Sequence, residues 1–512
     1  MSEPKQVPTV MIVGAGLGGL LLGVLLERIN VPYHIFERAP VVKPLGAVMA
    51  LGSNALPIFE QLGLLGEIEK ISLPCRSIEI HGAERELLGS INLSGHKAVA
   101  GYENNMFARP RLYQILLNQV PANKISLGKK VLRTEEKEGK VTIHCSDGSS
   151  YEGDLLVGAD GAYSGVRQSL YKRLSDKRLL PKDDQENLSI GYVSMVGVTE
   201  TLDPEKFPIL KRDFSNLYKV IGKEGRGCSI DAIPDGRIGW LLTVQLDEEE
   251  AKVQQFRNSE WGPESNDAML KDFEDMPCPF GGTLADLFAF TPKHLISKVF
   301  LEEKMFKTWY HGRTVLLGDA CHKMLPGAGQ GAVNAIQDAV VLANSIYNMV
   351  DVSEESITNG FKDYYSQRYE RAREQIKRSS NMSSLLSGQT LKDKVIRHIV
   401  LNYVPEWILQ WRLEKTFEYR PQIAWMPLVE NRGTGKVLPQ ECKRYDDDRR
   451  APNSALPMFY RPGLGVHQDA KTNLSTDISE KDWDKLLIVY LCRISTQKQG
   501  YCGCKALTLI LM

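Results

Sequence analysis

The sequence contains no long uninterrupted hydrophobic run. Its most apolar stretch, residues 10–26, carries no charge but is broken by five glycines. No basic segment or small-residue cleavage pattern accompanies it, as a secretory signal would require. A strand and a helix that are buried on both faces produce the same hydropathy as a membrane span. We therefore reject a transmembrane or signal segment here and expect a buried strand followed by a buried helix.

An excess of one charge is also missing, because Lys plus Arg and Asp plus Glu both number 63. No net field thus favours nucleic acid or anionic lipid. The nine cysteines lack the spacing of a disulfide framework, which predicts reduced thiols and a cytoplasmic protein. Cys492, Cys502 and Cys504 could bind a metal, but no fourth ligand lies nearby, so we favour a disordered tail and expect no metal.

Glycine is concentrated where the predicted strand ends. Val10–Val13 leads into Gly14-Ala15-Gly16-Leu17-Gly18-Gly19. Gly14 permits a tight turn, Gly16 lets backbone N–H groups approach a pyrophosphate, and Gly19 lets helix and strand pack closely. The N-terminus of the following helix adds a partial positive charge. This arrangement predicts a dinucleotide-binding turn.

An acidic residue follows at the distance that such a turn requires. A second predicted strand, residues 31–36, ends at Glu37, about 20 residues after the glycines. Its carboxylate is placed to accept hydrogen bonds from an adenosine ribose, and an acid there argues against a 2′-phosphate. Arg38 follows directly and weakens that last inference. The set predicts a site for the pyrophosphate and adenosine ribose of a bound dinucleotide.

Two further segments combine an apolar run with glycine and aspartate. The first is residues 154–161, with Gly158-Ala159-Asp160-Gly161, followed by Ser164 and Arg167. The second is residues 315–331, with Gly318-Asp319-Ala320, His322, Pro326 and Gly329-Gln330-Gly331. Together the three segments predict a buried flavin adenine dinucleotide (FAD). Asp160 could instead cap a turn, Asp319 could be an N-cap, and His322 could be a core histidine as readily as a flavin neighbour.

Hydrophobic periodicity predicts a discontinuous domain. A βαβ unit opens the chain, helices are expected at 54–62, 162–170, 332–349 and 357–382, and an Asp147-Gly148 hairpin turn is expected. Strand patterns dominate residues 189–247, and acidic helical patterns follow at 248–256 and 267–275. We expect an FAD-binding domain in 7–185 and 295–385, an antiparallel-sheet substrate domain in 186–294, a helical extension in 386–435 and a disordered tail in 436–512.

In the extension, Trp407 and Trp411 could mark a lid or a membrane-surface patch, although a helix packed on the body is favoured.

The three segments resemble those of the group A flavoprotein monooxygenases, the aromatic hydroxylases typified by p-hydroxybenzoate and salicylate hydroxylases and by zeaxanthin epoxidase. The resemblance covers about residues 9–380 and is closest to fungal enzymes of secondary metabolism. It implies an α/β fold with a discontinuous Rossmann-like FAD-binding domain and an inserted antiparallel sheet. Arg109-Pro110-Arg111-Leu112 also resembles the family's helix start, whose first Arg reaches FAD.

The resemblance assigns roles to residues of this chain. Asp160-Gly161 matches the motif linked to the FAD pyrophosphate and to nicotinamide-cofactor binding, and Asp319-Ala320 matches the acid that binds the ribityl chain. Pro326 and Gly329-Gln330-Gly331 match the loop beside the isoalloxazine, and Asn334 follows. Backbone amides there, at the helix start from Ala332 onward, would stabilise negative charge on reduced flavin. Cys321, where alanine is common, departs slightly from the pattern.

The implied reaction uses NADH or NADPH and O2 to hydroxylate or epoxidise an electron-rich arene or alkene through a flavin C4a-hydroperoxide in a dry pocket. No second Gly-x-Gly-x-x-Gly follows a strand, so NAD(P)H is expected to bind transiently on the FAD domain. Residues proposed as pocket walls are Tyr192, Met195, Tyr218, Trp240 and Leu241. The flavin-proximal candidates are Pro326 and His322, and no acid–base pair can be picked out.

Two alternatives remain open at this point. One is an FAD-dependent reductase or dehydrogenase of the same fold that does not use O2, and the other is a non-catalytic FAD-binding regulatory protein. The Asp, His and Pro of residues 318–331 stand at hydroxylase spacing and favour the monooxygenase. Membrane association is left open as peripheral contact with an internal membrane.

Overall fold

A computed structural model describes residues 7–42, 46–186, 188–246, 263–388 and 390–440 of the chain. All of these belong to one compact unit, Met1–Arg444. The predicted acidic helix at 248–256 and the tail from residue 441 onward, with its three clustered cysteines, lie outside the described residues.

The predicted βαβ unit is the centre of a parallel sheet. Strand β1 (Val10–Val13) is buried on both faces and pairs with β2 (Tyr33–Phe36) and β11 (Leu155–Gly158), while helix α1 (Leu17–Arg28) connects β1 to β2. Val13 aligns with both Phe36 and Gly158 in register. The glycine turn, Glu37 and Asp160 therefore emerge at the same edge, where the carboxyl ends of parallel strands meet.

The sheet has six strands in all. Their order is β17 (Tyr310–His311), β18 (Thr314–Leu316), β11, β1, β2 and β7 (Ile125–Ser126). Because β18 is parallel to β11, the loop at Gly318 joins the other two glycine segments at that edge. A separate three-stranded sheet contains β8 (Val131–Lys137), β9 (Lys140–Cys145) and β10 (Ser150–Gly153). Its β9–β10 turn has Gly148 at φ +81°, so the predicted hairpin is confirmed.

A second, largely antiparallel sheet of ten strands lies beside the first. Its order is β19 (His322–Lys323), β16 (Ser297–Met305), β12 (Ser189–Val198), β15 (Arg237–Gln245), β14 (Arg226–Ile233), β13 (Ser215–Ile221), β4 (Leu73–His81), β6 (Asn105–Ala108) and β3 (Val48–Leu51), with β5 (Leu87–Asn92) paired to β4. The sheet is larger than residues 186–294, because strands from 48–108 and from 297–323 join it. The domain boundaries stay a prediction.

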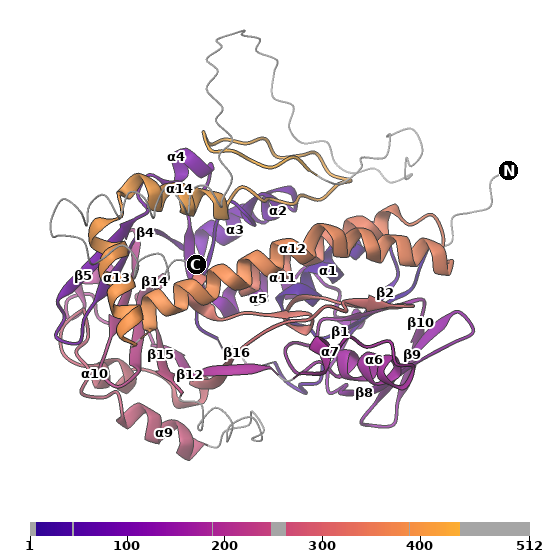
Figure 1. The fold of residues 1–512 in the computed structure, drawn as a ribbon, viewed down its shortest axis with the longest axis horizontal. Coiled ribbons are helices and arrows are strands. Elements are labelled where there is room, and N and C mark those ends of the chain that lie inside the picture. The colour runs from indigo at the N-terminus through magenta and orange to yellow at the C-terminus, as the bar shows by residue number, and fades with distance from the viewer. Residues whose placement is uncertain (1–6, 43–45, 187, 247–262, 389, 441–512) are drawn as a thin grey trace, which may run out of the picture. The chain divides into compact units, whose positions relative to one another are not determined.

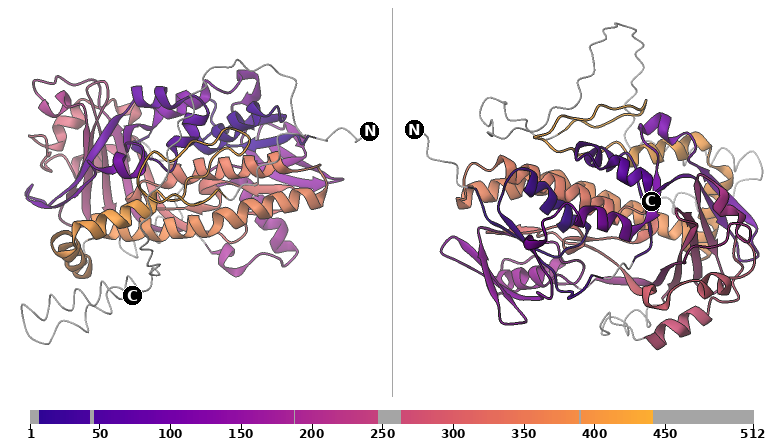
Figure 2. Two further views of the ribbon diagram at one scale, coloured as in Figure 1. Left: turned by 90° about the horizontal axis from the view of Figure 1, so that it is seen from above. Right: turned by 180° about the vertical axis from the view of Figure 1, so that it is seen from behind.

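Helices cover both sheets. The remaining helices are α2 (Leu56–Gln61), α3 (Leu65–Lys70), α4 (His96–Ala100), α5 (Arg109–Leu117), α6 (Gly165–Asp176), α7 (Lys182–Gln185), α9 (Pro263–Lys271), α10 (Leu284–Ala289), α11 (Gly331–Asn348), α12 (Glu354–Ser387), α13 (Leu391–Tyr403) and α14 (Glu406–Thr416). Helix α1 packs on α11, and α11 packs on α12, which reaches from one sheet to the other (Figures 1 and 2).

The helical extension is attached to the body of the protein. Leu401 of α13 and Leu413 of α14 pack on apolar residues of the ten-stranded sheet, as the packed-helix interpretation requires. Leu391 and Trp407 of the same helices are exposed. In the part of the chain that the structure describes, every helix is too short or too polar to span a bilayer.

Candidate functional site

The glycine turn after β1 is shaped by close backbone contacts. Gly14 has φ +106°, and a Cβ there would lie 2.4 Å from the carbonyl oxygen of Ala159. A Cβ on Gly19 would lie 2.1 Å from the carbonyl oxygen of Gly14. Both positions therefore need glycine for the turn itself to form. Gly16, the N-cap of α1, differs because a Cβ there would meet nothing within 4 Å. Open space thus faces the helix N-terminus, where a phosphate would bind.

Glu37 links the turn to the end of β2. Its carboxylate accepts hydrogen bonds from the backbone N–H groups of Ala15 and Ala39, each at 2.9 Å. The acid therefore lies directly against the glycine turn, as the dinucleotide prediction requires. Arg38 points to solvent and is exposed.

Arg109 begins α5 near these residues. The side chain is exposed and forms no hydrogen bond or ion pair with the residues that the structure describes. Its charge contributes to the lowered pKa of Asp319, and it partly opposes the rise that burial causes in the pKa of Tyr113, so Arg109 lies close to both. An exposed guanidinium without a protein partner is well suited to a phosphate oxygen.

Tyr113 is a site residue that the sequence analysis missed. Burial, followed by the charge of Glu37, raises its pKa, and its hydroxyl is buried with no partner among the described residues. A buried polar atom of this kind usually has a partner in the functional protein. Tyr113 follows Arg109 by four residues, so the two share a helix face, and that spacing could have identified it.

Asp160 has a structural role at the start of α6. Its carboxylate accepts hydrogen bonds from the Ser164 hydroxyl at 2.5 Å and from the Val166 N–H at 3.2 Å. Burial raises the pKa of Asp160, and these hydrogen bonds oppose that effect. Gly161, at φ +81°, makes the turn between the acid and the helix. The turn-capping interpretation therefore accounts for the contacts of Asp160 within the protein.

Arg167 connects the second glycine segment to the third. Its buried guanidinium donates to the carbonyl oxygens of Ala320, at 2.9 Å, and Ala162, at 2.6 Å. It also lies over the Phe306 ring. Because its donors are directed at main-chain oxygens, Arg167 holds the two loops together.

The third segment carries an ion pair at its surface side. Lys323 donates to the Asp319 carboxylate at 2.6 Å. Burial opposes ionisation of Asp319, but the charges of Lys323, His322 and Arg109 together lower its pKa. Asp319 therefore stays an anion beside Arg109, and the neighbouring Ala320 is fully buried.

His322 belongs to a buried polar cluster. Its Nε2 lies 2.6 Å from a carboxylate oxygen of Asp338, which also accepts from the N–H of Gly318 at 3.0 Å. Arg368 of α12 donates to the other oxygen of Asp338 at 2.7 Å. Cys321, His322 and Asp338 could in principle hold a metal, but the contacts to Arg368 and Gly318 already occupy the carboxylate. The core-histidine interpretation of His322 accounts for these contacts.

Asn334 is drawn into the same cluster. Its side-chain oxygen accepts from Arg368 at 2.8 Å, and its amide donates to the carbonyl oxygen of Gln330 at 2.9 Å. The side-chain amide of Asn334 is buried and holds the loop that precedes α11. A contact between Asn334 and the cofactor stays a prediction.

The loop of residues 326–331 leads into the N-terminus of α11. Gly329 has φ +64°, and a Cβ there would meet nothing within 4 Å. Gly331 and Ala332 are half-buried in the first turn of the helix, and the N-cap residue Gln330 supplies no side-chain cap. The Pro326–Ala328 turn rests on α12 through Ser379 and Ser383. Backbone N–H groups of the first turn are thus available to an anionic or polar ring.

The residues proposed as pocket walls divide between two faces of the ten-stranded sheet. Met195, Tyr218 and Trp240 point toward α9 and α10, where Met195 and Trp240 are fully buried in a hydrophobic core. The prediction that these three side chains line a substrate pocket was wrong, because they point into the core under α9 and α10. Alternate residues of a strand face opposite sides, so the remaining two candidates lie on the opposite face. Tyr192 and Leu241 lie on the other face, together with Ser194 and Thr243.

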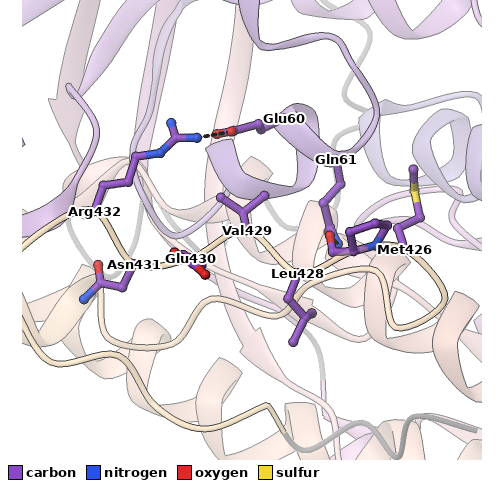
Figure 3. Close-up of a pocket in the computed structure, with 9 residues that line it drawn as sticks. Glu60, Gln61, Met426, Leu428, Val429, Glu430, Asn431 and Arg432 are labelled. Atoms are coloured by element: carbon purple, nitrogen blue, oxygen red, sulfur yellow. Dashed lines mark hydrogen bonds and ion pairs between the residues drawn. The ribbon is translucent and has the colours of Figure 1, made fainter. Parts of the chain in front are cut away.

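A surface pocket lies elsewhere, between the end of α2 and residues 426–432 (Figure 3). Its polar groups bind one another: Glu60 pairs with Arg432, and Gln61 donates to the carbonyl oxygens of Ile423 and Pro427. None of its lining residues is a predicted site residue, so we assign this pocket no function.

Comparisons with known proteins agree with this geometry. A family model described as the FAD binding domain matches residues 7–180 and 288–379. The FAD-dependent monooxygenase ausM of Penicillium brasilianum is 28% identical over 445 residues, covering 84% of this chain and 90% of the relative. Aurachin C monooxygenase/isomerase of Stigmatella aurantiaca is 30% identical over 341 residues, covering 66% of this chain and 80% of the relative.

Solved structures show the same fold. The HpxO protein of Klebsiella pneumoniae complexed with FAD and uric acid matches with a TM-score of 0.64 at 23% identity, covering 80% of this chain and 96% of that one. The 2,6-dihydroxypyridine-3-hydroxylase of Arthrobacter nicotinovorans matches with a TM-score of 0.60 at 18% identity, covering 75% and 94%. The predicted FAD-binding α/β fold is thereby confirmed. The chain belongs to the FAD-dependent monooxygenase family, of the fungal secondary-metabolism type.

Proposed function

We propose that the chain uses NAD(P)H and O2 to hydroxylate or epoxidise an electron-rich organic substrate. The observation that carries this proposal is the open space in front of Gly16, at the N-terminus of α1, with Glu37 against the turn. The family membership supports the same kind of reaction, and the unpartnered Arg109 and Tyr113 fit a charged dinucleotide.

The residues of the chain fit FAD. The N–H groups around Gly16 would bind the pyrophosphate, helped by the α1 dipole and by Arg109. Glu37 would accept hydrogen bonds from the ribose hydroxyls, and Tyr113, on which the charge of Glu37 acts, would contact the same end. Asp319 and the first turn of α11, Gly331 and Ala332, would hold the ribityl chain and ring. When bound, FAD supplies hydride acceptance from NAD(P)H and activation of O2.

The protein itself contributes to the reaction by orienting the cofactor and by excluding water from the site. Arg167 holds the Asp160 and Ala320 loops together, and Asp338 holds the loop at Gly318. The first-turn N–H groups of α11 stabilise negative charge without moving, because they are fixed by the helix. NAD(P)H binds transiently on the FAD domain, and the face of the ten-stranded sheet that carries Tyr192 and Leu241 covers the substrate.

A reductase or dehydrogenase of the same fold is the second candidate. It would share the glycine turn and Glu37 but would not consume O2. The Asp319, His322 and Pro326 spacing favours the monooxygenase over this reductase and over a non-catalytic FAD-binding protein. We also propose a cytoplasmic location, from the scattered cysteines and the balanced charge.

The test is NADH and NADPH oxidation by the purified full chain, followed with an oxygen electrode and a peroxide assay across phenols and polyprenyl alkenes. A substrate that accelerates O2 uptake without matching peroxide supports the monooxygenase. Reduction of bound flavin with no substrate-dependent O2 uptake would support the reductase. A chain that holds no flavin after reconstitution would overturn both.

A further inference from the structure

The two faces of the ten-stranded sheet are packed differently. One face carries the hydrophobic core under α9 and α10, whereas the other carries smaller apolar clusters and also buries ionisable side chains. On β13 and β14, Val220, Cys228 and Ile230 belong to the hydrophobic core under α9 and α10. Their neighbours on the same strands, Lys219 and Asp231, therefore point to the opposite face. We call this opposite face the inner face, because it lies toward α12 and β3.

Two ionisable side chains are buried on the inner face with no side-chain hydrogen bond to any residue that the structure describes. Lys219 and Asp231 are each 5% exposed. They sit diagonally across the β13–β14 pair, where Leu217 opposes Asp231 and Ser229 opposes Lys219. One carboxylate oxygen of Asp231 has no partner, and Lys219 makes neither a hydrogen bond nor an ion pair with the described residues. The two groups interact electrostatically, but they do not satisfy each other.

The neighbourhood of Asp231 reaches the start of α5. Asp231 aligns with Gly239 of β15, and the space in front of Gly239 is filled by Val48 of β3. Val48 in turn pairs with Ala108, the residue before Arg109. The turn after β14 is held to the same helix by an ion pair between Asp235 and Arg111. Asp231 therefore lies near the start of α5, the helix that carries Arg109, a proposed cofactor contact.

The contacts around Lys219 extend to the loop of residues 326–331. Lys219 aligns with Ile80 of β4, which packs against Leu386 near the end of α12. One to two turns earlier, Ser379 and Ser383 of α12 hold the Pro326–Ala328 turn. Leu217 and Ile78 lie beside the pair on the inner face, and Ser229 lies opposite Lys219.

Burial without a partner is costly for both groups. Burial raises the pKa of Asp231 to about 8, and it lowers the pKa of Lys219. Ionisable groups in this condition occur mainly where a ligand completes their hydrogen bonding. Buried polar atoms that serve only the fold are normally satisfied within it.

We propose that Lys219 and Asp231 form the polar anchor of the substrate pocket, and that the substrate is a mainly apolar molecule whose hydroxyl or carbonyl oxygen hydrogen-bonds with this pair. The pair carries opposite charges or none, so it does not favour a carboxylate substrate. Lys219 can donate to the oxygen, and Asp231 can accept from a hydroxyl. This inference rests on the proposed function, because it assumes that the inner face covers the substrate.

The test compares 2-naphthol with 2-methoxynaphthalene as probes of the FAD-loaded full chain. The two differ only in the hydroxyl hydrogen, which the ether has replaced by methyl. Binding is measured from the perturbation of the flavin absorbance near the ring band. We expect the wild-type chain to prefer the naphthol by about tenfold, the value of one hydrogen bond. In D231L, which removes the acceptor of the hydroxyl hydrogen, this preference should fall to about twofold or less. K219M removes a donor to the oxygen that both probes keep, so it should weaken the binding of both probes to a similar extent.

The controls separate the anchor from a purely structural role. K223M removes a lysine from the exposed pair with Glu84, just after β13, and should keep the full preference. If a single variant does not fold, the double variant K219M/D231L replaces both buried polar groups with apolar ones and should fold without the preference. A wild-type chain with no preference, or a double variant that keeps it, would overturn the proposal. Loss of flavin binding in the wild-type chain would instead contradict the proposed function.

Discussion

At the scale of single residues, the glycines of the first turn have different tasks. A Cβ at Gly19 would lie 2.1 Å from the Gly14 carbonyl oxygen, whereas one at Gly16 would meet nothing. Protein packing therefore requires glycine at position 19, while only a ligand would require it at position 16. Gly16 is the N-cap of α1 with φ −72°, a backbone conformation that other residues also adopt, so the backbone does not require glycine there either.

We expect G16A to keep the stability of the apoprotein within about 0.5 kcal/mol and to weaken FAD binding by about tenfold or more, because the methyl group occupies the phosphate side. G19A should destabilise the apoprotein by about 2 kcal/mol, since overpacking moves the backbone. Urea unfolding and flavin fluorescence titration measure the two effects. G66A, at another open position, is the control. Unchanged FAD affinity in G16A would count against this turn as the pyrophosphate site.

Arg109 provides a second test at this scale, because its side chain has no partner among the described residues. R109Q should unfold at the same denaturant concentration as the wild-type chain but bind FAD about tenfold more weakly, with a smaller dependence on salt. A charge-assisted hydrogen bond contributes about 1.5–3 kcal/mol. R111Q, which removes the exposed ion pair with Asp235, should bind FAD normally. Equal effects of the two substitutions would show that Arg109 has no special contact.

At the scale of elements, a buried cluster joins the third glycine segment to α11 and α12. Asp338 of α11 and Arg368 of α12 are both fully buried and pair at 2.7 Å, and Asp338 also binds His322 and the Gly318 N–H. Because every partner comes from a different element, the cluster fixes the loop against both helices. Removal of one charge leaves the other buried and unpaired, which is strongly destabilising.

D338N should therefore lower the free energy of unfolding by about 3 kcal/mol at pH 7. Burial opposes ionisation, but His322 and Arg368 lower the pKa of Asp338 to about 2, below its unfolded value of about 3.9. A lowered carboxyl pKa stabilises the fold above the unfolded pKa, and this contribution is lost as the pH falls through the folded pKa. The difference between wild type and D338N should thus narrow between about pH 4 and pH 2 in thermal unfolding. E84Q, at an exposed carboxylate, is the control. A difference that stays constant with pH would contradict this assignment.

At the scale of the whole molecule, the segment after α14 ties the extension to the FAD-binding half. Phe417 and Ile423 are buried, and Arg420 donates to the carbonyl oxygens of Phe417 and Ala100. Asn344 of α11 exchanges hydrogen bonds with Gln422 and Ala424. The partners in these contacts lie far apart in sequence, so the segment joins the extension to α11 and to the end of α4.

A chain that ends at Gln440 should consequently be more stable than one that ends at Thr416. Burial of two large apolar side chains contributes about 3 kcal/mol or more, and the buried hydrogen bonds add to this. Calorimetry of the two truncated chains measures the difference. The substitution I423A in the full chain isolates the packing contribution and should cost about 2–4 kcal/mol. Equal unfolding temperatures for the two truncations would show that the segment adds little.

The sequence by itself determined the elements whose signals are local. The turn at Gly14–Gly19, the acid at residue 37 and the helix from residue 331 follow from glycine positions and periodicity within one short stretch. The three glycine segments together predicted an FAD site, but the structure was needed to show that β1, β11 and β18 are parallel neighbours whose carboxyl ends meet at one edge.

Only the tertiary structure decided which side chains meet. Asp338 and Arg368 are thirty residues apart, and no local pattern links a buried aspartate to a particular arginine. The face occupied by Trp240, and hence the face left to Lys219 and Asp231, depends on which helices cover the sheet. A period of two separates the faces of a strand but does not say which one is packed. That choice comes from long-range packing, whose free energy is spread over the whole core.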